Sequence, residues 1–192
     1  MAPISRRSFL AGSLALPAGF GLMRPASGQA LAPTRACGPA TERQTEGPYF
    51  KPDTPLKRSL LPAGYGGAVF QLSGLVLDTG CRPVPGALVE LWHADDRGVY
   101  DNAGYRGRGH QFTDDRGRFD FETMLPGLYP GRTRHFHLKV QAPGGPVLTT
   151  QLYFPNERGN RRDFLYDPSL EMTLAPAGTV TRGHFDFVVA TA

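Results

Sequence analysis

The sequence predicts a mainly β protein, an antiparallel β-sandwich with an irregular N-terminal arm and long loops. Three observations support this fold class. The 192 residues include 24 glycines and 18 prolines, segments with a helical period are few, and short runs of alternating apolar and polar residues are bounded by turn residues. A chain of this length can bury one hydrophobic core.

Residues 1–30 have the layout of an export signal. Paired arginines, Arg6 and Arg7, precede an apolar run over residues 9–23, and small residues follow over 26–30. This order is typical of a signal peptide, and the arginine pair before Phe-Leu is similar to the twin-arginine type of bacterial signal. The alternative is a short amphipathic or membrane-anchoring helix, although the run is short for a membrane span. We expect an exported protein, periplasmic or secreted, with no transmembrane segment in its mature form.

The net charge does not favour nucleic acid as a partner. The formal charge of the chain is +4, and three arginines without any acid lie in the expected signal, so residues 31–192 carry +1. Proteins that bind nucleic acid usually present a clustered basic face. No such cluster with interleaved aromatic residues occurs in this sequence, and we expect no nucleic-acid partner.

The chain contains two cysteines, Cys37 and Cys81. In an oxidising compartment an even number of cysteines permits a disulfide. This disulfide would tie the N-terminal arm to a turn near the first strand. Two unpaired thiols, one of them buried, are the alternative.

An arm without regular structure is expected over residues 31–67, before a sandwich over residues 68–192. Proline, glycine and scattered polar residues fill the arm, and no period is sustained. The segment Thr45 to Phe50, Thr-Glu-Gly-Pro-Tyr-Phe, predicts a rigid turn with aromatic side chains. This turn would either cap one end of the sandwich or form a wall of a pocket.

Six or so strands are expected over residues 68–192. The first begins near Val69, where Phe70 and Leu72 alternate with residues that face the other side. Residues 118–122 alternate in the same way, with both phenylalanines facing the core. The remaining expected segments are strands over residues 87–93, 135–140, 147–154 and 183–189, a looser segment over 102–112, and a charged loop or short helix over 155–172.

His135 and His137 are the first candidates for chemistry. In a β-strand, the period of two places both imidazoles on one face and Phe136 on the other. Two imidazoles on one face suit a metal ion, although a solvated strand face would show the same pattern. For the isolated His110 and His184 we expect structural roles, with the ring satisfied by hydrogen bonds.

Two tyrosines extend this candidate metal site. Tyr100 and Tyr129 each follow a glycine-bearing turn at a strand end, where loops often carry function. Two phenolates with two imidazoles suit Fe(III) better than zinc, because phenolate is a hard, anionic donor. A site of two histidines and one carboxylate is not favoured, since the nearby acids Asp120 and Glu122 are expected to face solvent.

The motifs of this region, in order along the chain, resemble those of the intradiol ring-cleavage dioxygenases. This family includes catechol 1,2-dioxygenases and protocatechuate 3,4-dioxygenases, and the resemblance runs from about Thr45 to Phe154. The motifs are Trp92-His93-Ala94, Gly98-Val99-Tyr100, Thr113-Asp114 with Gly117, Pro126 to Tyr129, Arg132, and His135-Phe136-His137.

The resemblance implies a non-haem Fe(III) held by two tyrosines and two histidines, together with a solvent hydroxide. Tyr100 matches the tyrosinate that stays bound throughout the reaction. Tyr129 matches the tyrosinate that is displaced when the substrate arrives. His135 and His137 match the two imidazole ligands.

The resemblance also implies residues that act on the substrate. Arg132 matches the arginine that steadies negative charge on the activated substrate, and Gln151 matches the pocket glutamine near the oxygen-binding space. Pro48 and Tyr49 are similar to the Pro-Tyr segment that walls the substrate cavity.

The function that the resemblance implies is cleavage of a catechol-type aromatic diol. The ring would open between the two hydroxyl-bearing carbons, with a small aromatic diol and O2 as partners and a cis,cis-muconate-type diacid as product. The chain lacks the long N-terminal helical region with which catechol 1,2-dioxygenases dimerise, so the sequence leaves open whether it forms a homo-oligomer. The alternative is a non-catalytic binding module of the transthyretin-like or carboxypeptidase-regulatory-like type, with His135 and His137 solvated.

Overall fold

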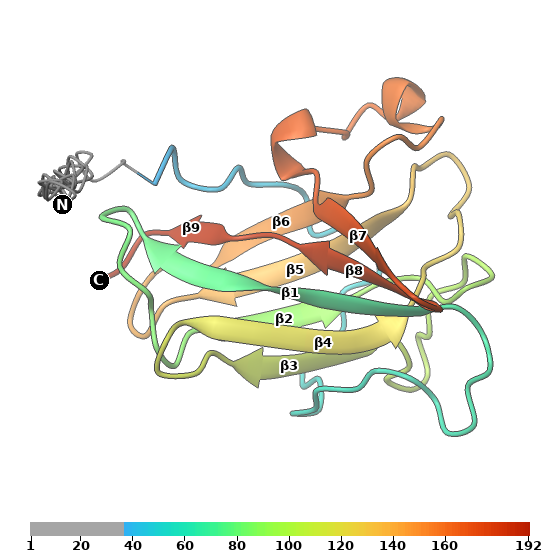
Figure 1. The fold of residues 1–192 in the computed structure, drawn as a ribbon, viewed down its shortest axis with the longest axis horizontal. Coiled ribbons are helices and arrows are strands. Elements are labelled where there is room, and N and C mark those ends of the chain that lie inside the picture. The colour runs from blue at the N-terminus through green and yellow to red at the C-terminus, as the bar shows by residue number, and fades with distance from the viewer. Residues whose placement is uncertain (1–36) are drawn as a thin grey trace, which may run out of the picture. The chain divides into compact units, whose positions relative to one another are not determined.

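The computed structural model describes residues 37–192, so the expected export signal lies outside the described residues. Two β-sheets form this part of the protein (Figure 1). The five-stranded sheet has the order β4-β1-β8-β7, with β9 also paired to β1, and comprises β1 (Val69–Asp78), β4 (Arg118–Met124), β7 (Thr173–Ala177), β8 (Val180–His184) and β9 (Phe187–Val189). The four-stranded sheet has the order β3-β2-β5-β6 and comprises β2 (Leu88–Trp92), β3 (Arg108–Phe112), β5 (His135–Gln141) and β6 (Leu148–Tyr153).

The core lies between the two sheets, as the predicted sandwich requires. Phe70 and Leu72 of β1 are buried at alternate positions. Phe136 of β5 faces them from the other sheet, with ring centroids of Phe70 and Phe136 5.4 Å apart. Each fully buried side chain of this size contributes about 1.5–3 kcal/mol to stability. Burial alternates along β1 and over residues 118–122 of β4, so the alternation predicted for both segments is confirmed.

Strand pairing is mixed rather than purely antiparallel. β8 and β9 both pair in parallel with β1, whereas the other strand pairs are antiparallel. The expected final strand over residues 183–189 is split, because the Asp186 side chain replaces a backbone acceptor there: Leu75 N–H donates to Asp186 Oδ1 at 2.8 Å.

Two strands, β3 and β7, were not predicted. β3 carries glycine and polar residues without a clean alternation, because it is an edge strand that the arm covers: His110 N–H donates to Pro55 O and Lys57 N–H donates to His110 O. β7 contains Pro176, which an edge strand tolerates because its N–H side needs no partner. Tertiary position, not local period, decides both segments.

The arm contains no strand over residues 37–67, in agreement with the sequence. Near its start, Gln44 N–H donates to Thr149 O along β6, and near its end it runs beside β3. Between these points it crosses the outer face of the four-stranded sheet, where Phe50 contacts Trp92 edge-on. A disulfide joins Cys37 to Cys81, so the predicted pairing is present in the structure.

The loop over residues 155–172 contains two short 3-10 helices, Asn160–Arg162 and Pro168–Leu170. The predicted charged loop or short helix is therefore confirmed. Within residues 37–192 we find no helix with the length and apolar character that a membrane span requires.

Candidate metal centre

The candidate site is built on the outer face of the four-stranded sheet. Across this sheet, Trp92 is paired with His137, and His137 is paired with Gln151. Residues in register on neighbouring strands project to the same face. Phe136 and Leu138 point into the core, so His135 and His137 point away from it, as the period of two predicts.

Three potential metal-ligand atoms converge above this face, two from β5 and one from the loop that contains Tyr100. Tyr100 Oη lies 3.3 Å from His135 Nε2 and 3.1 Å from His137 Nε2, and the two Nε2 atoms are 3.1 Å apart. All three side chains are buried. The predicted ligands Tyr100, His135 and His137 are therefore brought together.

The protonation of His135 favours metal binding. Its Nδ1–H donates to Thr133 O at 2.6 Å. This bond places the ring proton on Nδ1 and leaves the Nε2 lone pair directed at the other donors, the arrangement in which a protein orients a metal-binding imidazole.

Burial keeps both imidazoles neutral. It lowers the pKa of His135 to about 4, and the charge of Arg132 acts in the same direction. Burial also lowers the pKa of His137 well below its usual value, and His135 and Arg132 add to the effect. The pKa of Tyr100 is raised by burial, so this phenol loses its proton only when a cation compensates the negative charge.

The donor set fits a hard metal cation. Two of the donors are imidazole nitrogens and the third is a phenol oxygen. Within residues 37–192, no group of three histidine, cysteine, aspartate or glutamate side chains lies close enough together to hold a metal ion. The Nδ1 atom of His137 is buried without a hydrogen-bond partner among the described residues. Two neutral imidazoles and a phenol oxygen that ionises when a cation binds are a donor set that suits a hard cation.

Tyr129 lies beside the three donors rather than among them. Its ring is edge-on to that of Tyr100, with centroids 5.8 Å apart. Its hydroxyl forms a 2.8 Å hydrogen bond with the hydroxyl of Tyr49. Tyr49 in turn stacks on Tyr100 at a centroid distance of 4.4 Å. The turn formed by Pro48 and Tyr49 therefore lies against the site, as the pocket-wall interpretation predicts.

Arg132 and Gln151 are also brought together. Arg132 Nη2–H donates to Gln151 Oε1 at 2.7 Å, and Gln151 Nε2–H donates to Thr45 O of the arm at 3.0 Å. Both residues thus adjoin the donors, because Gln151 is the register partner of His137.

Two contacts of the site were not predicted from the sequence. Trp92 stacks on His137 with ring centroids 5.2 Å apart and planes within 9°. Trp92 lies in one of the motifs that resemble the family, but the sequence predicts no contact between it and a metal ligand. Asp163 binds the guanidinium of Arg132. It lies in a loop without a period, and no local pattern marks it.

The remaining histidines named as structural are satisfied elsewhere. His110 Nδ1–H donates to Thr54 O at 2.8 Å. His184 is exposed and lies 3.1 Å from the carboxylate of Asp186. Neither ring approaches the three donors.

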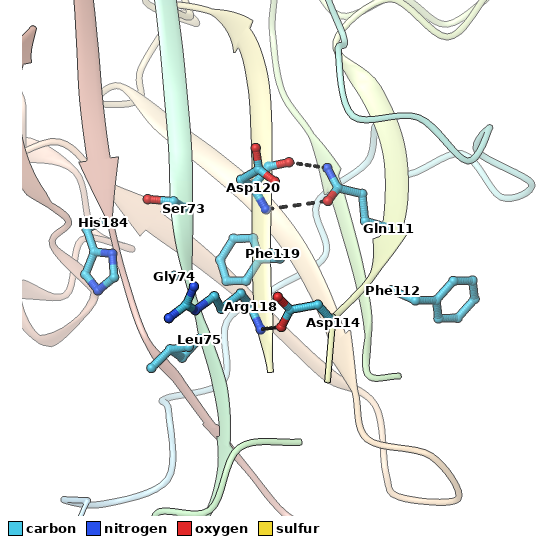
Figure 2. A pocket seen from close by; sticks show the side chains of 10 residues that line it. All are labelled: Ser73, Gly74, Leu75, Gln111, Phe112, Asp114, Arg118, Phe119, Asp120 and His184. Carbon is cyan, nitrogen blue, oxygen red and sulfur yellow. Dashed lines mark hydrogen bonds between the residues drawn. The ribbon is translucent and has the colours of Figure 1, made fainter. Parts of the chain in front are cut away.

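A hollow of about 600 Å³ opens on the described surface away from the candidate site (Figure 2). Its polar groups bind one another: Arg118 N–H donates to Asp114 Oδ1 at 2.8 Å, and the Gln111 amide bonds to the backbone of Asp120. This hollow contains none of the predicted site residues.

Comparison with known proteins identifies the family of this chain. A family model described as Dioxygenase (Dioxygenase_C) matches residues 45–181. A hydroxyquinol 1,2-dioxygenase from Rhodococcus opacus is 33% identical over 74% of this chain and 57% of its own length. A catechol 1,2-dioxygenase from Candida albicans is 29% identical over 56% of this chain and 45% of its own length. The chain thus spans about half the length of these curated relatives.

Solved structures show the same fold. The dioxygenase domain of a dioxygenase–carbohydrate-binding protein fusion from the cellulolytic bacterium Streptomyces sp. SirexAA-E is 51% identical with a TM-score of 0.78, over 80% of this chain and 100% of that chain. Catechol 1,2-dioxygenase from Pseudomonas arvilla C-1 is 25% identical with a TM-score of 0.72, over 80% of this chain and 63% of that chain. These matches and the family model show that the chain belongs to the dioxygenase family, the intradiol ring-cleavage dioxygenases.

Proposed function

We propose that this protein is a non-haem Fe(III) intradiol dioxygenase. It cleaves a catechol-type aromatic diol with O2 between the two hydroxyl-bearing carbons and yields a cis,cis-muconate-type diacid. The observation that carries this proposal is the convergence of Tyr100 Oη with the Nε2 atoms of His135 and His137, all within 3.3 Å of one another. The relatives named catechol and hydroxyquinol 1,2-dioxygenases support an aromatic diol as the substrate class.

Four residues would hold the iron: Tyr100, Tyr129, His135 and His137. When bound, Fe(III) would supply a Lewis acid that makes the aromatic diol reactive toward O2. The low pKa values of the two histidines keep their lone pairs available across the neutral range.

Tyr129 is the residue best placed to move a proton. Its ring is half-buried, and its hydroxyl is held by Tyr49 rather than by the two imidazoles. In the proposed reaction its phenolate oxygen accepts a proton from an incoming diol hydroxyl, which is general-base work. Tyr49 then remains as the hydrogen-bond partner of the Tyr129 hydroxyl.

Arg132 supplies a fixed positive charge beside the donors. Its side chain is largely buried, and Gln151 holds one end of the guanidinium. A fixed cation in a site with little water stabilises negative charge that develops on the substrate. The aromatic turn of the arm, with Tyr49 over Tyr100 and Phe50 against Trp92, limits the entry of water.

The non-catalytic alternative does not account for this geometry. A binding module of the transthyretin-like or carboxypeptidase-regulatory-like type leaves His135 and His137 solvated. In the structure their exposed fractions are 4% and 3%. Burial of two polar rings with converging nitrogens carries a cost that a function must offset.

The test is reconstitution with Fe(III) followed by oxygen-uptake measurements. The protein should turn red to burgundy through tyrosinate-to-iron charge transfer, and it should consume O2 with at least one of catechol, protocatechuate, hydroxyquinol and chlorocatechols. The ring-opened diacid should be identified by mass spectrometry. A colourless protein that holds no iron, or an iron-loaded protein inactive on the whole panel, would contradict the proposal.

Export is a separate part of the proposal. We expect residues 1–30 to direct the protein out of the cytoplasm, because paired arginines precede an apolar run. Replacement of Arg6 and Arg7 by lysine should retain the protein in the cytoplasmic fraction. Unchanged export of that variant would show that the arginine pair is not the signal.

A further inference from the structure

Asp163 is a buried carboxylate whose oxygens are both fully engaged. The side chain is 1% exposed. Arg132 Nε–H donates to Oδ1 and Oδ2 at 3.0 and 2.8 Å. The backbone N–H of Thr133 donates to Oδ2 at 2.9 Å, and that of Leu165 donates to Oδ1 at 3.0 Å. Three N–H groups thus make four contacts with the carboxylate. They fix it between the residues just before β5 and the loop over residues 155–172.

These bonds determine where the guanidinium of Arg132 lies. Asp163 holds the Nε edge, and Gln151 accepts from Nη2 at 2.7 Å. Because the guanidinium is planar and rigid, contacts at two of its nitrogens, Nε and Nη2, restrict its position and its plane. Arg132 extends on a flexible stem, and without the carboxylate it would keep the contact with Gln151 but lose its charged partner.

Asp163 remains charged at neutral pH. Burial raises its pKa, but the N–H groups of Leu165 and Thr133 and the guanidinium of Arg132 more than offset burial, so that the pKa lies below its usual value. The carboxylate therefore acts as a permanent anion opposite a permanent cation.

We propose that Asp163 is a positioning residue of the active site, which fixes the Arg132 guanidinium between the loop over residues 155–172 and Gln151, facing the bound diol. This role rests on the proposed function, because it assigns the orientation of the charge that acts on the substrate. The competing explanation is structural: Asp163 would only anchor the loop through the N–H groups of Thr133 and Leu165.

A neighbouring ion pair offers a matched control. Arg134 Nε–H donates to Glu157 Oε1 at 2.9 Å, and the two side chains are 21% and 27% exposed. This pair joins the same end of β5 to the same loop, but it has no contact with Gln151 or with the three donors among the described residues. Glu157→Gln therefore removes the charge of a comparable pair without touching the site.

The first measurement needs neither iron nor substrate. In the iron-free full chain, the Arg132 Nε–H should give a slowly exchanging nitrogen–proton resonance, identified by its absence in Arg132→Ala. In Asp163→Asn its exchange with solvent should be at least about tenfold faster, because the negative charge is lost and an NH2 donor replaces one of the two acceptor oxygens. Glu157→Gln should leave the rate unchanged. An unchanged exchange rate in Asp163→Asn overturns the proposal whatever the activity.

The second measurement uses the iron-loaded enzyme and a double-mutant cycle. Asp163→Asn should lower kcat about tenfold to a hundredfold with KM within about threefold, as expected when a charge is misplaced in the transition state. Glu157→Gln should stay within about twofold of the parent chain. Because Asp163 acts through Arg132, the double variant Asp163→Asn/Arg132→Ala should be no slower than Arg132→Ala alone.

The outcomes separate this role from the proposed function. Additive losses in the double variant, or a parent-like kcat in Asp163→Asn, overturn the positioning role. An iron-loaded parent protein that is inactive on every diol contradicts the function, while the exchange measurement still decides whether Asp163 fixes Arg132. If Asn at position 163 unfolds the chain, Asp163→Glu, which keeps the charge but lengthens the side chain, is tested by the same two measurements.

Discussion

His93 and His137 are both buried imidazoles of the four-stranded sheet region, yet their ring nitrogens have different fates. In His93, Nδ1–H donates to Ala94 O and Nε2 accepts from Thr123 Oγ1, both at 2.7 Å. In His137, Nε2 faces Tyr100 and His135, and Nδ1 has no partner among the described residues. Burial alone therefore does not mark a functional histidine. The distinguishing feature is where the ring nitrogen lies: Nε2 of His137 lies together with two other potential metal ligands, whereas Nε2 of His93 is occupied by a hydroxyl.

The largest expected difference concerns iron content. His137→Ala should lose the metal, because it removes one of three converging donors. His93→Gln should keep it, because a glutamine amide can both donate and accept in place of the ring. Metal analysis after reconstitution checks both variants. Full iron occupancy in His137→Ala would exclude His137 as a ligand.

Tyr129→Phe should have the next largest effect. The variant should keep its iron but show a shifted visible absorption and slower substrate binding, because it lacks the phenolate that accepts the substrate proton. Tyr105→Phe is a suitable control, since this half-buried tyrosine donates its hydroxyl proton to Pro52 O at 3.3 Å, away from the three donors. Stopped-flow absorbance measures the binding step. Turnover of Tyr129→Phe equal to that of the control would show that the displaced-ligand role is wrong.

Two glycines allow a matched test of the two histidines. Gly47 and Gly107 have φ of +72° and +64°, and a Cβ on either would lie 3.2 Å from the Cε1 atom of His137 or His93, respectively. Alanine at either position should cost about 1–2 kcal/mol of stability because of the left-handed backbone. Only Gly47→Ala should weaken iron binding, since it displaces a ligand. Denaturant unfolding and iron titration measure the two effects, and equal loss of iron affinity in both variants would remove the distinction.

The pH dependence of the iron-free protein should include a contribution from His93, besides those of His135 and His137. Burial lowers the pKa of His93 to about 4. The unfolded chain, with a pKa near 6.5, then binds a proton that the folded chain does not. The contribution of His93 is therefore complete above about pH 6.5 and is lost as the pH falls toward 4. Unfolding curves across this range should be flatter for His93→Gln, and an identical pH profile would show that His93 does not contribute.

The sequence contained enough to predict the sandwich and the common face of His135 and His137, because strand alternation is local. The glycine-bearing turns at strand ends singled out Tyr100 and Tyr129, and the resemblance supplied Arg132 and Gln151. Asp163 could not be predicted, since it meets Arg132 only through the folding of a loop that lies 31 residues further along the chain. The strands β3 and β7 at the sheet edges were missed for a related reason: each pairs with a single strand of its sheet and needs no apolar alternation.

The arm that walls the site is part of a covalent ring. The Cys37–Cys81 disulfide spans 44 residues of sequence, and the Pro48-Tyr49 turn lies inside that span. A protease that cuts the backbone once within the ring produces two fragments that stay joined. The nicked arm would therefore remain tethered beside Tyr100, and both cleavage and reduction would be needed to separate the fragments.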